Sequence, residues 1–332
     1  MIALPFSEGA RGEAVADLQR RLLALNVLDP IGDAPGTFGP ATTTAVRNFQ
    51  QRYGLVVDGI CSDLTWTVLV EVGYCLGDRQ LYLRSPMMRG DDIAALQACL
   101  GSLGFDAGRA DGIFGPRTAT AIAEFQRNAG LMSDGICGPD TYTALDRLGP
   151  ERTAALMVNQ VRERERLRTA PPGLDGRRVM IGHQGGAAPL TSALHRLLRD
   201  AGARVLTFSH PDGPTQARLA NSADGDVFVE LQLTPGPSHR LAYFRGVRFW
   251  SQPGHALAQH AGQALAVILG VEPEVVGMRL PLLRETRMPA IVIEIGPASR
   301  VVTQNEQIAT AIAQALVSWA TEPVSLPLVQ RL

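Results

Sequence analysis

A 76-residue repeat constrains the first half of this 332-residue chain more than any other feature. Residues 36–42 read GTFGPAT and residues 112–118 read GIFGPRT, while the segment DGIC begins at Asp58 and again at Asp134. A fixed period of this kind indicates two copies of one structural unit. Each copy is only about 60 residues long, so each is expected to have a small core.

Each copy has the pattern of three short helices. Apolar residues recur at helical spacing before a Gly/Pro loop and again after it. In the first copy a second helix is expected from Thr42 to Tyr53, and Pro40 just before it suits a helix start. A turn at Asp58-Gly59 precedes a third helix that begins near Asp63. The second copy repeats this order, which predicts two small all-α repeats.

The second copy resembles the PGBD-1 family of peptidoglycan-binding domains over residues 111–141, which read DGIFGPRTATAIAEFQRNAGLMSDGICGPDT. The first copy departs from the family pattern, because residues 61–63 read CSD where GPx is usual. Gly, Phe and Leu in this motif mainly build turns and core. The resemblance implies that exposed polar residues near the loops contact glycan or peptide. The candidates are Arg109, Asp111 and Arg117.

The last part of the chain alternates short apolar runs with amphipathic segments. Strands are expected at residues 178–182, 204–208, 226–232, 242–247 and 290–296, and helices at 190–201, 215–223, 255–269 and 303–319. Such alternation predicts an α/β domain with a mostly parallel sheet. The predicted boundaries are 1–72 for repeat 1, 73–148 for the inter-repeat segment and repeat 2, 149–176 for a linker, 177–322 for the α/β domain and 323–332 for a C-terminal tail.

This domain resembles the zinc-dependent N-acetylmuramoyl-L-alanine amidases of the amidase-3 family, most clearly over residues 280–296, LPLLRETRMPAIVIEIG. That family holds zinc with His, Glu and His and keeps a catalytic Glu. The resemblance places His183 at the first ligand and Glu294 at the catalytic position. Gln232 stands where the second His is expected, and residues 184–199 contain no Asp or Glu that would supply the remaining ligand.

The missing ligands determine the chemistry expected here. A catalytic zinc needs three protein ligands and one open position, and it lowers the pKa of bound water from 15.7 to about 7. A single His and a neutral amide do not hold zinc well. The sequence therefore predicts vestigial roles for His183 and Glu294 and no bound cofactor; zinc is expected only if the chain is an active amidase.

Composition excludes several other classes. All 31 basic residues are Arg, so the chain has no P-loop lysine, no Schiff-base lysine and no Ser-Lys dyad. The net charge of -1 argues against nucleic acid as the main partner, because that role usually needs a basic face.

We also searched the sequence for patterns that direct a protein to export or to a membrane. No secretory pattern opens the chain, and no apolar run approaches the ~20 residues that span a bilayer. A cytoplasmic location is therefore expected. The four cysteines lack C-x-x-C spacing, which favours reduced thiols, although a disulfide between two of them stays open.

Two binding repeats followed by a degenerate amidase domain resemble the amidase-like regulators of actinobacteria. The resemblance implies control of peptidoglycan precursor synthesis through contact with the UDP-N-acetylglucosamine enolpyruvyl transferase and the lipid II export machinery, together with binding of peptidoglycan or its precursors. Two alternatives remain open. One is a zinc amidase that cleaves the muramoyl–L-alanine amide bond, and the other is a wall-binding scaffold.

Overall fold

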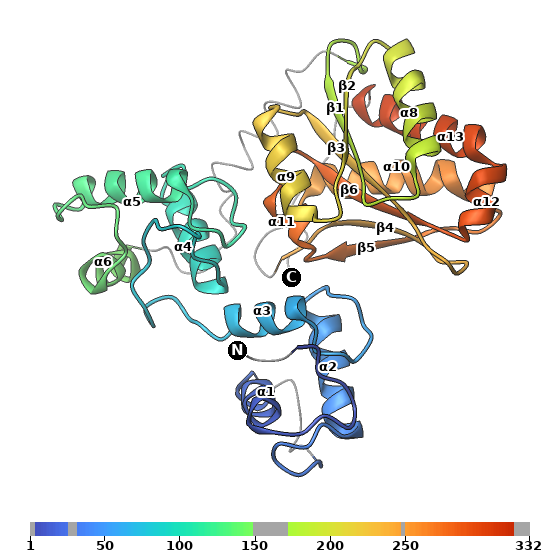
Figure 1. Cartoon of the computed structure of the whole chain (residues 1–332). Coiled ribbons are helices and arrows are strands. Elements are labelled where there is room, and N and C mark those ends of the chain that lie inside the picture. Colours follow the sequence, from blue (N-terminus) through green and yellow to red (C-terminus); the bar gives the residue numbers. More distant parts are fainter. Residues whose placement is uncertain (1–3, 26–31, 149–171, 247–249, 322–332) are drawn as a thin grey trace. The chain divides into compact units, whose positions relative to one another are not determined.

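The computed structural model describes residues 4–25, 32–148, 172–246 and 250–321. Most of the predicted linker at 149–176 and the whole predicted tail at 323–332 lie outside these residues. The chain divides into two compact units, the helical repeats and the α/β domain. Each unit is described by itself below (Figure 1).

Both repeats have the three predicted helices. Repeat 1 contains α1 (Glu13–Ala24), α2 (Pro40–Arg52) and α3 (Asp63–Glu71), and repeat 2 contains α4 (Asp91–Ser102), α5 (Pro116–Asn128) and α6 (Pro139–Leu148). Proline occupies the first turn of α2 and α5, where its missing N–H would have no intrahelical partner anyway. The Ser62 side chain caps α3 by accepting a hydrogen bond from the Thr65 N–H. The prediction of two all-α repeats is confirmed.

Each repeat has its own core, and many positions of the two cores correspond. Phe38 and Phe49 are fully buried in repeat 1, as Phe114 and Phe125 are in repeat 2. Leu81, from the segment between the copies, lies in the core of repeat 2. Its backbone bridge to Cys137 matches the bridge between Phe6 and Cys61 in repeat 1. The segment before α4 is therefore the first structural segment of repeat 2.

A buried glutamine closes the last turn of each repeat. In repeat 1 the Gln50 Nε2 donates to Asp58 Oδ1 at 2.8 Å and to the Ile60 carbonyl at 3.0 Å, while its Oε1 accepts from the Asp58 and Gly59 N–H groups. Gln126 makes the same set of bonds around Asp134 and Gly135 in repeat 2. Because Gln50 is only 1% exposed, these bonds replace the water that its amide and the turn would otherwise contact.

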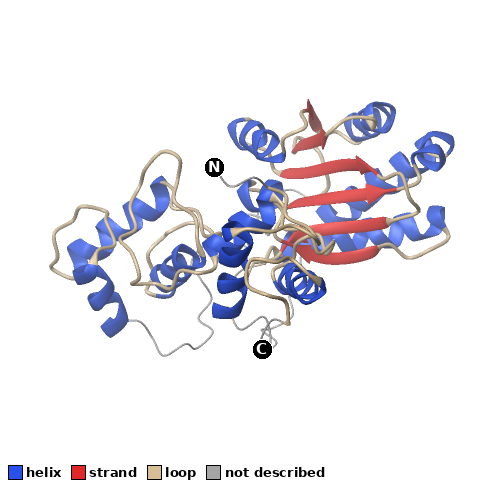
Figure 2. Cartoon of the chain, turned by 60° about the horizontal axis from the view of Figure 1, so that its bottom comes forward, coloured by secondary structure: helices blue, strands red, loops and turns tan. Residues whose placement is uncertain are grey.

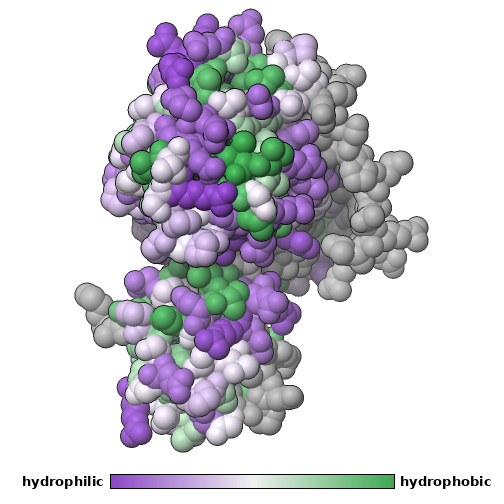
Figure 3. Space-filling model, turned by 90° about the vertical axis from the view of Figure 1, so that its right-hand side faces the viewer, coloured by the Kyte–Doolittle hydropathy of each residue, from purple (hydrophilic) through white to green (hydrophobic). Residues whose placement is uncertain are grey.

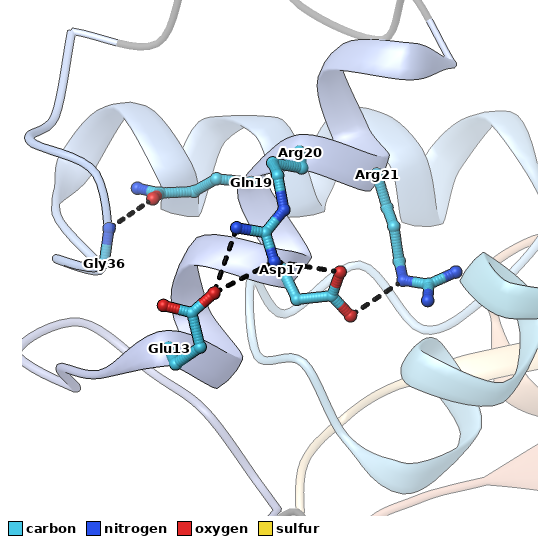
Figure 4. Close-up of polar contacts among 6 residues, drawn as sticks. All are labelled: Glu13, Asp17, Gln19, Arg20, Arg21 and Gly36. Atoms are coloured by element: carbon cyan, nitrogen blue, oxygen red, sulfur yellow. Dashed lines mark hydrogen bonds and ion pairs between the residues drawn. The ribbon is translucent and has the colours of Figure 1, made fainter.

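A second glutamine holds the Gly/Pro loop against the first helix. In α1 the Gln19 Oε1 accepts from the Gly36 N–H at 2.8 Å, whereas the neighbouring arginines pair with Glu13 and Asp17 on the exposed side of the helix (Figure 4). Gln97 accepts from the Gly112 N–H in the same way. The residues that recur at the same positions in the two copies therefore form hydrogen-bonded turns.

The second unit contains one six-stranded sheet within the described residues, in the order β2-β1-β3-β6-β4-β5 (Figure 2). The strands are β1 (Arg178–His183), β2 (Arg204–Ser209), β3 (Val227–Leu233), β4 (His239–Phe244), β5 (Glu274–Met278) and β6 (Ala290–Ile295). Only the β4–β6 pair is antiparallel. This confirms the predicted α/β domain with a mostly parallel sheet.

Helices cover both faces of the sheet (Figure 1). They are α8 (Ala188–Asp200), α9 (Gly213–Ser222), α10 (Gln252–Leu269), α11 (Pro281–Glu285), α12 (Ala298–Thr303) and α13 (Asn305–Thr321). Alternate strand residues such as Ile181, Val229 and Ile293 share one core with α8, α10 and α13. The residues between them face the opposite side, where Glu230 contacts Gln216 of α9.

The sequence patterns missed β5 and the short helices α11 and α12. The β5 strand has Gly277 in its interior, lies at the edge of the sheet and pairs with β4 alone. Its side chains are mostly half-buried, so the run lacks the continuous apolar signal of an inner strand. The fourth strand also begins earlier than expected, at His239 rather than at residue 242.

Among the described residues, no helix has the length and apolar character needed to cross a membrane. On the face drawn in Figure 3, apolar residues form several patches separated by polar ones.

The glutamine turn generates a stability prediction. Replacing Gln50 by Leu leaves the buried Gly59 N–H and the Asp58 N–H without their acceptor, and each such group costs about 1–3 kcal/mol. We expect Gln50→Leu to lower the opening free energy of residues 54–63 by about 2–4 kcal/mol, measured by native-state hydrogen exchange on the whole chain.

Gln51→Leu is the matched control, since Gln51 is the exposed neighbour on the same helix. Equal exchange rates in the two variants would contradict the structural role of Gln50.

Candidate functional site

The candidate catalytic residue Glu294 is held in an ion pair. It lies near the end of β6, directly opposite Gln232 of β3 and Arg240 of β4 in the sheet register. Arg240 Nε and Nη2 both contact Glu294 Oε2, at 2.9 and 2.6 Å. The Glu294 side chain is 12% exposed and the Arg240 side chain 25%. The Glu294 carboxylate is therefore largely shielded from water and paired with the Arg240 guanidinium.

The candidate metal ligand His183 lies on the other face of the sheet. Residues 179, 181 and 183 of β1 alternate toward α8, and Val179 and Ile181 belong to the core on that side. His183 lines a cavity together with Thr191 and His195 of α8. Gln232 and Glu294 each stand next to a core residue of their strand, so their side chains face the side of the sheet opposite α8. The structure thus joins Gln232 to Glu294 and separates both from His183.

The buried carboxyl group of Glu230 lies on the same face of the sheet as Gln232. Glu230 is fully buried on β3, and its Oε1 accepts from Gln216 Nε2 at 3.1 Å. Burial raises the pKa of Glu230 to about 7, against the smaller lowering effect of its hydrogen bonds with Gln216 and Gln232. A Cβ at position 182 would collide with Glu230 and Gln216, so only glycine fits beneath this pair.

These residues do not fit a catalytic zinc. A zinc site needs three nitrogen, sulfur or carboxylate ligands converging on one point. Here the expected second His is the amide of Gln232, the Glu294 carboxylate is paired with Arg240, and His183 lies across the sheet. Within the parts of the chain that the structure describes, no group of three or more His, Cys, Asp and Glu side chains is arranged to hold a metal.

The three candidate binding residues of repeat 2 lie at the loop before α5 and at the start of that helix. Asp111 Oδ1 accepts from Gln97 Nε2 at 3.1 Å and from the Ile113 N–H at 2.9 Å, so this carboxylate builds the turn. Arg117 Nη2 pairs with Asp106 at 2.6 Å, and its side chain is 62% exposed. Arg109 is half-buried in the same loop. Contact of these residues with glycan or peptide stays a prediction.

Sequence reasoning missed the polar side of α8. Thr191, Ser192 and His195 lie at helical spacing i, i+1 and i+4, and all three line the cavity beside His183. The signal was present in the sequence, because Leu190, Leu194 and Leu198 mark the buried side of this helix and Thr191 lies at its edge, next to Leu198 on the helix surface.

The raised pKa of Glu230 predicts how stability depends on pH. A carboxyl group whose pKa is higher in the folded state is accommodated best when protonated, so its stabilising effect is lost as pH rises from about 4.5 through about 7. We expect the unfolding free energy of wild type to fall, between pH 5 and pH 8, by on the order of 2–3 kcal/mol more than that of Glu230→Gln. Calorimetric unfolding of the whole chain measures this difference.

Glu274→Gln serves as the control, because Glu274 is an exposed carboxyl on β5. If Glu230→Gln follows wild type and the control across this range, Glu230 is not the titrating group.

Comparison with known proteins agrees with this architecture. A family model described as a putative peptidoglycan binding domain matches residues 11–69 and 89–145. The N-acetylmuramoyl-L-alanine amidase CwlM of Mycobacterium tuberculosis is 32% identical over 358 residues, covering 93% of this chain and 87% of that protein. The N-acetylmuramoyl-L-alanine amidase CwlL of Bacillus licheniformis is 34% identical over 161 residues, covering 42% of this chain and 45% of that protein.

Among solved structures, an N-acetylmuramoyl-L-alanine amidase from Clostridium difficile 630 aligns with 44% of this chain and 97% of its own, at 18% identity and a TM-score of 0.38. The sequence identity to CwlM extends through both repeats and the α/β domain, so it covers the whole architecture rather than one module. The chain therefore belongs to the CwlM family, in which two peptidoglycan-binding repeats precede an amidase-like α/β domain.

Proposed function

We propose that this protein is a catalytically degenerate, amidase-like regulator of peptidoglycan precursor synthesis that acts by binding cell-wall enzymes or precursors. The ion pair between Arg240 and Glu294 carries the proposal. A general base must accept a proton from the reacting water, and here two guanidinium nitrogens of Arg240 already donate to Glu294 Oε2. A cytoplasmic location belongs to the same proposal.

Among the residues that the structure describes, no ligand set converges on one point, which supports the same proposal. Without a metal that lowers the pKa of the attacking water, the amidase reaction has no nucleophile at neutral pH. Gln232 is a neutral amide, and its Nε2 group is a donor rather than a metal ligand. Its neighbour Glu230 is fully buried, which favours its neutral form and weakens it as a replacement ligand.

The remaining parts of the chain support a binding function rather than catalysis. The repeats belong to a peptidoglycan-binding family, which makes peptidoglycan or its precursors the natural ligands. The resemblance to actinobacterial amidase-like regulators adds two protein partners, the UDP-N-acetylglucosamine enolpyruvyl transferase and the lipid II export machinery.

The second candidate function is a zinc-dependent N-acetylmuramoyl-L-alanine amidase. The names of the relatives favour it, since both CwlM and CwlL are called N-acetylmuramoyl-L-alanine amidases. This reading requires that Gln232 and the Arg240–Glu294 pair rearrange so that a metal site forms beside His183.

Zinc content separates the two functions. We expect the untagged protein to retain well under one zinc per chain after zinc loading and desalting, measured by mass spectrometry, because its ligands do not converge. His183→Ala should leave this value unchanged, and the protein should release no peptide from peptidoglycan. One zinc per chain that His183→Ala abolishes, together with amidase activity, would establish the amidase instead.

Partner binding tests the regulatory role directly. We expect the purified chain to bind the UDP-N-acetylglucosamine enolpyruvyl transferase of the same bacterium saturably and to change its turnover rate. Titration calorimetry measures the binding, and a coupled phosphate-release assay measures the rate. No binding and no rate change at concentrations up to about 100 μM, an affinity limit near 5–6 kcal/mol, would remove this enzyme as the target.

A further inference from the structure

A polar cavity opens where β1 and β2 end and α8 begins. Its volume is about 370 Å³, within the range of pockets that hold small organic molecules. Six polar side chains line it, namely His183, Thr191, Ser192, His195, Thr207 and Ser209. The register places His183 directly opposite Ser209, so two strands and one helix contribute to the same wall. Ligands of parallel α/β sheets commonly bind at this carboxyl end of the strands.

Two of these side chains have buried polar atoms without partners. Thr191 is 5% exposed, and its Oγ1 makes no hydrogen bond to any residue that the structure describes. A helical threonine usually bonds its hydroxyl to the carbonyl four residues earlier, and Thr191 does not. The Nδ1 atom of His183 is likewise buried and without a partner among the described residues. Buried polar atoms are nearly always hydrogen-bonded in native proteins, so a water or a ligand is expected to partner both atoms.

The first turn of α8 borders the same cavity through Ala188, whereas the next residue, Pro189, has no N–H to donate. The helix is 13 residues long, and no side chain caps its N-terminus at Ala187. Gly185 and Gly186 precede it in left-handed backbone conformations, and Ala188 lines the cavity. The uncapped N–H groups of a first helical turn carry a partial positive charge and favour anions.

The side chains that line the cavity indicate which charge a ligand would carry. Hydroxyl and imidazole groups all donate hydrogen bonds, and no carboxylate is among the side chains that line the cavity. Such a lining favours an oxyanion and gives a cation no charged ligand. The cavity is also larger than a single inorganic ion requires. We propose that it binds the phosphoryl group of a small organic phosphate. This site is separate from the proposed partner binding and does not depend on it.

Titration calorimetry on the full-length protein tests the proposal with four probes at equal ionic strength: inorganic phosphate, inorganic diphosphate, uridine diphosphate and acetate. We expect uridine diphosphate to bind with a dissociation constant below about 1 mM and acetate not to bind. Thr191→Val keeps the shape of the side chain but removes its hydroxyl, and should weaken binding by about tenfold. Thr310→Val on α13 is the matched control and should leave the affinity unchanged.

His195→Gln provides a second variant whose side chain is only half-buried, in case Thr191→Val perturbs folding; it too should weaken binding. Tighter binding of inorganic diphosphate than of uridine diphosphate would support the phosphoryl site but assign it to the free ion. Equal heats for all four anions, or affinity that neither variant changes, would overturn the proposal. So would saturable zinc binding lost in both His183→Ala and His195→Gln, without any phosphate binding, because the cavity would then hold a metal.

Discussion

The pairing of Arg240 with Glu294 determines what the strand ends of the α/β domain can do. Both side chains are largely buried, and a charge taken out of water is stable only with a partner. Removing either one leaves the other as an uncompensated charge, so the pair stays closed in the folded state. Because β4 runs antiparallel to β6, the register itself sets Arg240 beside the carboxylate. The topology of the sheet thus places the Glu294 carboxylate in an ion pair with Arg240.

The same requirement for partners shapes the repeats. Gln50 and Gln126 are buried amides that satisfy backbone groups of the turns beside them, and each repeat copies the arrangement with nearly the same distances. Asp111 serves its own turn in this way, although sequence alone makes it a candidate for ligand contact. Motif residues in a small domain are therefore constrained first by the hydrogen bonds that hold its loops, because a core of this size contributes little stability to spare.

Most of the fold was predictable, and the exceptions have physical causes. The repeat period and the apolar spacing determine the six helices of the repeats, and apolar runs mark the inner strands of the sheet. The edge strand β5 escaped notice because half-buried side chains around Gly277 have no clear period. At the site, sequence identified His183, Gln232 and Glu294 but not their separation, since the face on which a strand residue lies depends on register and on where each strand ends.

That separation bears on the ligand that we propose for the cavity beside His183. A catalytic zinc needs three converging protein ligands, and the segment between β1 and α8 supplies no carboxylate to such a set. In this chain the segment is short and rich in glycine, it leads directly into an uncapped helix, and it carries no acidic side chain from residue 184 to residue 199. Removing negative charge from the start of a helix weakens a cation site and strengthens an anion site at the same place. In the proposed phosphate site, His183 therefore lies among side chains that can donate hydrogen bonds, with no carboxylate among them.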